Sequence, residues 1–278
     1  MPKHRKEFQE YIKVADKPVV TLDLYRESPA TAFLHAAVEA KCAAVLCLNH
    51  FKINSRGGYN QSATNAIQII NASLLAYVMS NFETYQKFFF AQLFEYSIYL
   101  KKFDVDKFIG NINNVIGRDI SISLVGFSAY RENPHSVGLV LAENLKNWHN
   151  PEMVKKYFGA FNLEDEHGHK TSFYSNDDIN DLIVLWQMRH SIVHNAGTIT
   201  LPDSQKMISL NQYGGKSIIL EEKFITEVVR KMHPLIKHST ERMKKVYMHN
   251  LLDTIPETTK QKIEKTFKVS SSCNVWLR

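Results

Sequence analysis

An arginine and two histidines lie close together near the end of a predicted helix. Residues 189–195 read Arg-His-Ser-Ile-Val-His-Asn, and the segment before them, from Asp178 onward, is mainly apolar. At about 100° per residue, one apolar stripe runs along this helix, formed by Ile179, Leu182, Ile183, Trp186 and Val193. Arg189 and His194 flank the stripe, and His190 lies close to its centre. Ionisable groups on a packed face are costly unless something satisfies them, so we interpret these three residues as a candidate site.

The chemistry that suits this group is phosphodiester cleavage in RNA. His194 falls in the last predicted turn, where the negative end of the helix dipole favours a protonated imidazole. A histidine that titrates near neutrality can remove the 2′-hydroxyl proton or protonate the leaving oxygen, and Arg189 offers a permanent charge for the phosphate. Five positions separate the two residues, so their side chains diverge by about 140° on one helix. We therefore expect two copies of the helix, packed about a two-fold axis, to form a shared cleft.

A structural role would give the same spacing. An arginine paired with an internal acid, beside a histidine that caps helix carbonyls, would produce this pattern in a monomer. The acidic and histidine run at 164–169 falls in a glycine-containing loop without a second ligand cluster, so a solvated charge run fits it better than a metal site. No Gly-x4-Gly-Lys-Ser/Thr motif is present, so we expect no ATPase activity. We expect neither a metal nor a cofactor.

The composition favours a folded protein in a reducing compartment. Of 278 residues, 44% are hydrophobic, and the net charge of +6 is a small bias toward a polyanionic partner. The chain has three cysteines, Cys42, Cys47 and Cys273, and an odd number does not suggest a disulfide framework. Cys42 and Cys47 lie in an apolar helical run, where buried free thiols are common. The basic start at 1–6 lacks a following apolar segment, and no run of 18 uncharged apolar residues occurs. We therefore expect a cytoplasmic protein without a signal peptide or a membrane span.

The hydrophobic pattern predicts an all-α bundle that positions the candidate site. Helices are expected at 30–51, 62–103 with a break or bend, 104–118, 137–148, from Asn150 onward, at 178–194 and at 221–252, the last bent at Pro234. Ser175 is the expected N-cap of the site helix, and Asn195-Ala196-Gly197 the expected stop. Residues 19–22 look β-like. Residues 198–220 predict a small β-hairpin or an extended insertion.

Residues 186–197, Trp-Gln-Met-Arg-His-Ser-Ile-Val-His-Asn-Ala-Gly, resemble the signature helix of the HEPN superfamily, closest to its abortive-infection and toxin-type (RiboL-PSP-like) branch. That motif is an Arg, four to six residues and a His, usually with a polar residue directly after the Arg. Here the follower is His190, where Asn is commoner. Residues 76–85 are similar to the first core helix of those proteins, in which a Glu commonly falls at the position of Glu83. The resemblance covers roughly residues 62–250.

Residues 1–60, which we expect to form an N-terminal helical extension, and residues 253–278, which we expect to form a peripheral C-terminal tail, lie outside the resemblance. The resemblance implies a HEPN domain at 61–252 that dimerises through its motif helices. It implies a metal-independent endoribonuclease that leaves a 2′,3′-cyclic phosphate and a 5′-hydroxyl. Proteins of this type often serve as toxins or in phage defence, so an antitoxin or defence-system protein is an expected partner besides RNA. Some HEPN domains are non-catalytic RNA-binding or scaffold subunits, and that alternative stays open.

The resemblance also implies a role for each of the candidate site residues. Arg189 and His194 are the expected catalytic pair, and His190 is expected to hold the polar network of the dimer interface. The main expected role of Asn195 is to cap the helix, and a role in the site is secondary. Glu83 is expected either to orient His194 or Arg189 from a second face or to be a solvated charge.

Overall fold

The computed structural model describes residues 12, 20–51, 53, 57–120 and 136–270. It confirms an all-α fold with a small two-stranded antiparallel sheet inside 198–220. The described elements, in chain order, are α1 (Leu22–Glu27), α2 (Pro29–His50), α3 (Gln61–Glu95), η2 (Tyr96–Tyr99), α4 (Val105–Ile116), α6 (Val137–Asn144), α7 (Pro151–Gly159), α8 (Asn176–His194), β1 (Thr198–Ile199), α9 (Leu201–Ser204), η3 (Ile208–Tyr213), β2 (Lys216–Ser217), α10 (Phe224–His249) and α11 (Glu257–Thr266).

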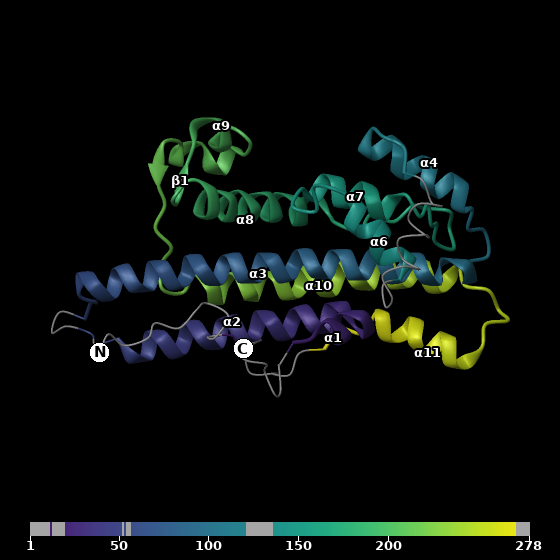
Figure 1. Ribbon diagram of the computed structural model, residues 1–278, viewed down its shortest axis with the longest axis horizontal. Helices are drawn as coiled ribbons and strands as arrows, with labels where there is room; N and C mark the ends of the chain where they lie inside the picture. Colours follow the sequence, from purple (N-terminus) through teal and green to yellow (C-terminus); the bar gives the residue numbers. More distant parts are fainter. Residues whose placement is uncertain (1–11, 13–19, 52, 54–56, 121–135, 271–278) are drawn as a thin grey trace, which may run out of the picture.

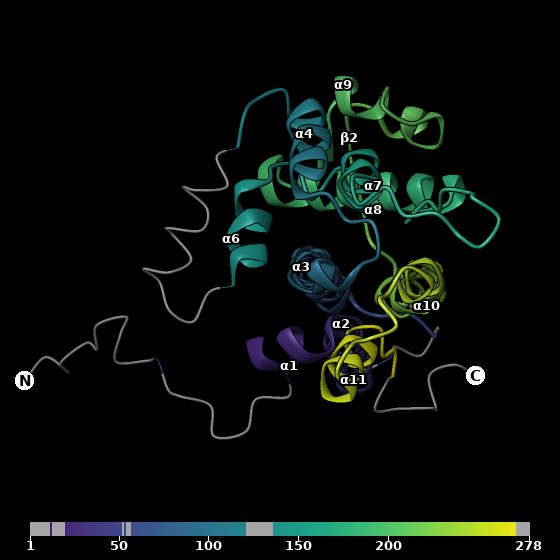
Figure 2. The same cartoon turned by 90° about the vertical axis from the view of Figure 1, so that its right-hand side faces the viewer.

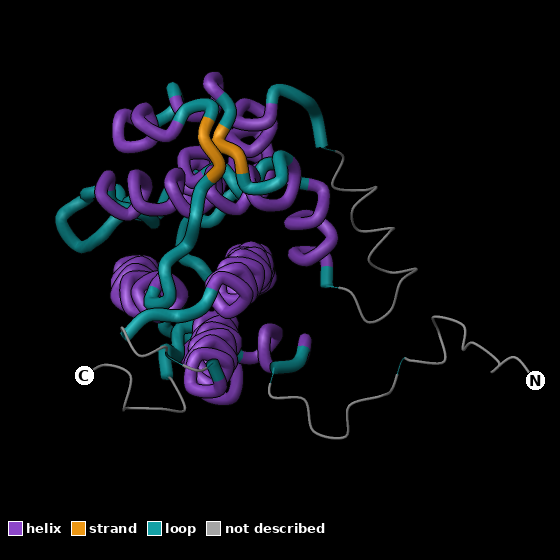
Figure 3. The backbone as a smooth tube through the Cα atoms, turned by 90° about the vertical axis from the view of Figure 1, so that its left-hand side faces the viewer, coloured by secondary structure: helices purple, strands orange, loops and turns teal. Residues whose placement is uncertain are grey.

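The helices stack in layers that run along the long axis of the molecule (Figures 1 and 2). One outer layer contains α1, α2 and α11, the middle layer contains α3 and α10, and the opposite layer contains α7 and α8. Strands β1 and β2 pair Thr198 with Ser217 and Ile199 with Lys216. This short sheet, orange in Figure 3, lies beside the end of α8 and carries α9 and η3 between its strands. The insertion therefore covers one side of the candidate site.

Helix α3 is continuous over 35 residues, which corresponds to about 52 Å at 1.5 Å per residue. The break that we expected within 62–103 is confirmed, but it lies near the end of the segment, so the molecule holds one long helix before it (Figure 1). The α-helix ends at Glu95 and continues as the 3-10 helix η2. Fully buried aromatic side chains hold α3 in the middle layer, namely Phe82, Tyr85, Phe89 and Phe90.

Helices α2 and α11, which lie before and after residues 61–252, pack into the core that those residues build. Phe33 of α2 is fully buried and contacts Phe82 of α3, with ring centroids 5.5 Å apart. Ile263 of α11 is also fully buried, and Phe267 contacts Phe89 at 5.6 Å. Residues 257–267 are thus part of the core, so the peripheral position that we expected for the tail does not apply to them.

Helix α2 is long and apolar enough, by length and composition, to span a membrane, and half of its most apolar window is buried within the protein. Cys42 and Cys47 are free thiols, of which Cys42 is exposed and Cys47 half-buried. The expected burial of both is wrong for Cys42, which lies on a side of α2 that faces away from the core. Cys273 lies outside the described residues.

The helices follow the sequence prediction except at two places. As expected, Asn150 accepts hydrogen bonds from the first turn of α7. Pro234 lies inside α10 and does not end the helix. Leu22, expected in a β-like patch, begins α1, because the Thr21 side chain accepts a hydrogen bond from the Leu24 N–H and caps the helix. Helix α10 is followed by α11 and is not the last helix.

Gly138 allows α6 to pack directly on α3. A Cβ atom at this position would lie 2.3 Å from the carbonyl oxygen of Ala91. We expect Gly138→Ala to destabilise the protein by about 1–3 kcal/mol or more, because two helix backbones must separate. Gly110→Ala is the control, since a Cβ there meets nothing within 4 Å and alanine favours a helix interior by about 0.5–1 kcal/mol. Urea unfolding measures both, and equal stability of the two variants would contradict this packing.

Candidate functional site

Helix α8 is fixed firmly at its start, well away from the candidate residues. Ser175 and Asp178 form a reciprocal capping box, as expected. The Asp178 carboxylate also accepts a hydrogen bond from Arg242 of α10, with Nη2 and Oδ2 2.8 Å apart. Since α10 belongs to the middle layer, this ion pair joins the start of α8 to the body of the protein.

The end of α8 turns directly into the insertion. Asn195 is the C-cap, and its backbone N–H donates to the carbonyl of Ser191 at 3.0 Å. Ala196 and Gly197 follow with φ of +50° and +80°, and the Gly197 N–H also donates to Ser191. Left-handed backbone suits glycine, so the predicted stop is confirmed. Asn195 acts here through its backbone.

The apolar stripe of α8 is buried along most of its length and emerges at the last turn. Leu182 and Trp186 are buried, whereas Val193 is 45% exposed. The His190 side chain is 48% exposed, although its place on the stripe predicts a packed face. The expectation of a packed position is therefore wrong for His190, because the buried face of α8 at this point runs through Gln187 and Ser191. His194 is exposed as well.

Arg189 keeps the position that the sequence predicts for it. Its side chain is half-buried, and its Nε atom is buried without a hydrogen-bond partner. No hydrogen bond or ion pair joins its guanidinium to any described residue, so the internal acid that a structural role requires is missing from the part of the chain that the structure describes. Burying an unpaired donor on a cation is costly. Arg189 is therefore a half-buried cation without an anionic partner in the described part of the chain.

His190 and His194 form an open imidazole pair at the end of the helix. Their ring centroids are 4.9 Å apart, which fits residues four positions apart on one helix face. His190 Nε2 lies 4.0 Å from Oδ2 of Asp203, and Asp203 is buried in the insertion. Lys206 donates to Asp203 at 2.6 Å and to Gln187 of α8 at 3.3 Å. The hydrogen bond from Lys206 holds the pKa of Asp203 below its usual range.

Sequence reasoning missed His149, which the fold brings to this site from the α6–α7 loop. Its ring centroid lies 6.2 Å from that of Trp186. Partial removal from water lowers the pKa of His149 below its ordinary value, and the nearby charge of Glu83 opposes this shift. Arg189, His190 and Lys206 also lower it through their positive charges. No sequence pattern connects His149 with the motif about forty residues later, and Asp203 and Lys206 also lack such a signal.

Glu83 has a different partner from the two that we expected. Its carboxylate forms an ion pair with Lys87, one turn along α3, at 2.6 Å. The structure gives Glu83 no hydrogen bond or ion pair with Arg189 or His194, and its connection to the site is the electrostatic effect on His149. Within the described chain, Arg189 and His194 also make no hydrogen bond with each other.

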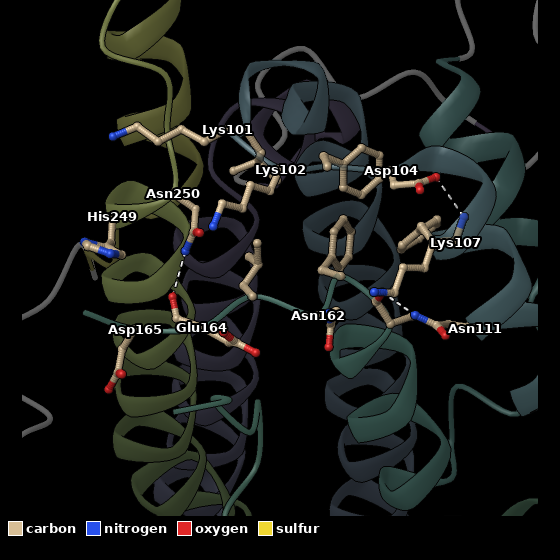
Figure 4. Close-up of a pocket in the computed structure, with 16 residues that line it drawn as sticks. Lys101, Lys102, Asp104, Lys107, Asn111, Asn162, Glu164, Asp165, His249 and Asn250 are labelled. Atoms are coloured by element: carbon tan, nitrogen blue, oxygen red, sulfur yellow. Dashed lines mark hydrogen bonds between the residues drawn. The ribbon is translucent and has the colours of Figure 1, made fainter. Parts of the chain in front are cut away.

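A separate cavity of about 400 Å³ lies beside α4, at the end of the molecule opposite α9 (Figures 1 and 4). Lys102 and Lys107 stand on opposite sides of it, and Glu164 and Asp165 line its lower edge. Asp165 accepts hydrogen bonds from the backbone N–H groups of His167 and His169. The charge run at 164–169 is thus a hydrogen-bonded turn, and the described residues contain no group of three side chains suited to a metal.

Comparison with protein-family models, curated proteins and solved structures finds no match to this chain.

The charges around His149 give opposite predictions for two variants. Glu83→Gln removes a negative charge that favours the imidazolium, so the pKa of His149 should fall further. Arg189→Gln removes a positive charge, so the same pKa should rise. An NMR titration of the imidazole resonances measures both shifts. Glu166→Gln, in the turn at 164–169, is the control and should leave the pKa of His149 unchanged. Shifts in the same direction for the two variants would contradict this arrangement.

Proposed function

We propose that the protein is a metal-independent endoribonuclease of HEPN type that acts as a homodimer in the cytoplasm, in phage defence or as a toxin. The observation that carries this proposal is an unpaired, half-buried Arg189 beside two exposed imidazoles at the open end of α8. A cation without an internal acid suits a phosphate. Exposed imidazoles suit proton transfer at neutral pH. The resemblance of residues 186–197 to the HEPN motif supports the same conclusion.

The reaction is an internal transesterification of RNA. The 2′-oxygen attacks the adjacent phosphorus as its proton leaves, and the bond from phosphorus to the 5′-oxygen breaks. Arg189 stabilises the negative charge that grows on the phosphate oxygens, and His194 takes part in the proton transfers. The products are a 2′,3′-cyclic phosphate and a 5′-hydroxyl, and the atoms balance without a metal or a second substrate.

Two subunits complete the site in this proposal. Arg189 is half-buried while His194 is exposed at the helix end, and neither contacts the other within the chain. Large apolar side chains are exposed on the last turn of α8 and on the insertion that follows it: Val193, Leu201, Ile208, Tyr213 and Ile219. Exposed apolar residues of this size suit an association face. A two-fold contact through it would bring Arg189 of one subunit near His194 of the other.

Arg189→Ala and His194→Ala should each abolish most RNA cleavage. Loss of charge stabilisation costs about 10²–10³-fold in rate, and loss of a proton-transfer group costs about 10²–10⁴-fold. The measurement is cleavage of total RNA in EDTA, with mapping of the product ends. His167→Ala removes an exposed histidine from the turn at 164–169 and is the matched control. Full activity of either site variant, or loss of wild-type activity in EDTA, would refute the proposal.

Mixed dimers test whether the site is shared. If Arg189 of one subunit acts with His194 of the other, a mixture of Arg189→Ala and His194→Ala subunits contains heterodimers with one intact cleft. Random pairing of equal amounts makes about half of the dimers heterodimers, and each heterodimer has one intact cleft of its two. The mixture should therefore recover about a quarter of wild-type activity. Co-refolding of the two inactive variants, followed by the cleavage assay, measures this. No recovery in a mixture that forms heterodimers would mean that the two residues act within one subunit.

A non-catalytic RNA-binding or scaffold module is the second candidate function. The exposed apolar residues near the end of α8 favour it, because they would suit a protein partner as well as a second copy. In that case the wild-type protein binds RNA or a partner protein and leaves RNA intact. Expression in cells separates the two functions, since toxicity relieved by His194→Ala requires catalysis.

A further inference from the structure

The loop that carries His149 is a rigid part of the structure. Trp148 is buried, and its indole N–H donates to the carbonyl of Ala142 at 2.9 Å. On the other side, Asn150 caps α7 by accepting hydrogen bonds from two backbone N–H groups. The backbone turns at Asn147, which has a φ of +63°. His149 therefore projects from a segment that is anchored directly before and directly after it.

The anchored loop directs the imidazole toward the candidate site. The His149 ring meets the Trp186 ring edge to face at 6.2 Å. Trp186 lies one turn before His190 and three residues before Arg189 on α8, so both of these lie on the same side of the helix as Trp186. The positive charges of Arg189 and His190 lower the pKa of His149. The contact with Trp186 thus places an imidazole from outside α8 on the side of the helix that carries Arg189.

We propose that His149 is the general base that removes the 2′-hydroxyl proton in the RNA cleavage assigned to this site. This inference rests on the proposed function and specifies it further. The 2′-hydroxyl proton moves to the free ring nitrogen of His149 as the 2′-oxygen bonds to phosphorus. The bond from phosphorus to the 5′-oxygen then breaks, and protonated His194 supplies the proton for that leaving oxygen. Arg189 stays charged throughout and holds the phosphate.

The surroundings of His149 suit a base better than an acid. Arg189 and His190 on α8 and Lys206 after α9 place positive charge near the ring, and Glu83 on α3 is the opposing carboxylate, itself paired with Lys87. Partial desolvation and these cations lower the pKa of His149, which favours the neutral ring that can accept a proton. A lowered pKa also places the acidic limb of the rate profile below that of an ordinary histidine.

The test uses two oligonucleotide substrates with one defined cleavage position. One is ordinary RNA, and the other has sulfur in place of the 5′-bridging oxygen, so that its thiolate leaves without protonation. His149→Ala should lose about 10²–10⁴-fold in rate on both substrates, because the 2′-hydroxyl must be deprotonated in each. His194→Ala should lose activity on ordinary RNA and recover it on the sulfur substrate. The wild-type acidic limb should be absent from the pH profile of His149→Ala.

A second variant separates proton transfer from packing. His149→Phe keeps a ring against Trp186 but cannot accept a proton, so it should be as defective as His149→Ala. Activity of His149→Phe near that of wild type would overturn the assignment, as would recovery of His149→Ala on the sulfur substrate. Thermal unfolding of each variant verifies that it is folded, and His167→Ala remains the matched control.

The outcomes distinguish this inference from the function on which it rests. If wild-type protein cleaves neither substrate, the proposed function fails and the role of His149 fails with it. If wild-type protein cleaves both, Arg189→Ala is inactive and His149→Ala stays within about twofold of wild type, the function stands and the base assignment alone is refuted.

Discussion

The packing of Trp186 determines where the chemical groups of α8 lie. Its indole contacts Phe82 of the central helix α3 at 6.4 Å and the ring of His149 at 6.2 Å. Phe82 is fully buried and also contacts Phe33 of α2. The position of α8 is thus set through one line of aromatic contacts that begins in the opposite outer layer. Beyond Trp186, Ser191 is still fully buried, whereas His190 and His194 lie on a side of the helix that remains exposed.

Polar atoms without partners gather on the same part of α8. Within the described chain, side-chain atoms of Trp186, Gln187, Arg189 and Ser191 are buried and make no hydrogen bond. Each such atom costs about 1–3 kcal/mol when nothing satisfies it. Native structures contain few of them, and those present need an explanation such as a bound ligand or water. Their concentration in two helical turns beside Arg189 marks a place where the fold gives up stability, as functional sites do.

Local signals in the sequence predict the elements, whereas the site depends on contacts that sequence spacing does not contain. The cap at Ser175 and the stop at Asn195 follow from short-range chemistry, so the limits of α8 are predictable. The exposure of His190 is not, because helical periodicity identifies the apolar stripe but not which of its positions the fold leaves exposed. His149 enters from a different loop, and only the tertiary packing of Trp148 and Trp186 brings it to Arg189.

In the proposed RNA cleavage, helix α8 supplies the general acid and the α6–α7 loop supplies the general base. General acid–base catalysis at one pH needs one group that is neutral and another that is protonated, so the two imidazoles require different surroundings. His190 and His194 share one exposed face at the same helix end, where the helix dipole acts on both. His149 on the α6–α7 loop is also exposed, but it packs against Trp186, and the positive charge of Arg189 lowers its pKa. Placing the base on a second anchored element therefore separates the two protonation states without moving either residue away from the phosphate.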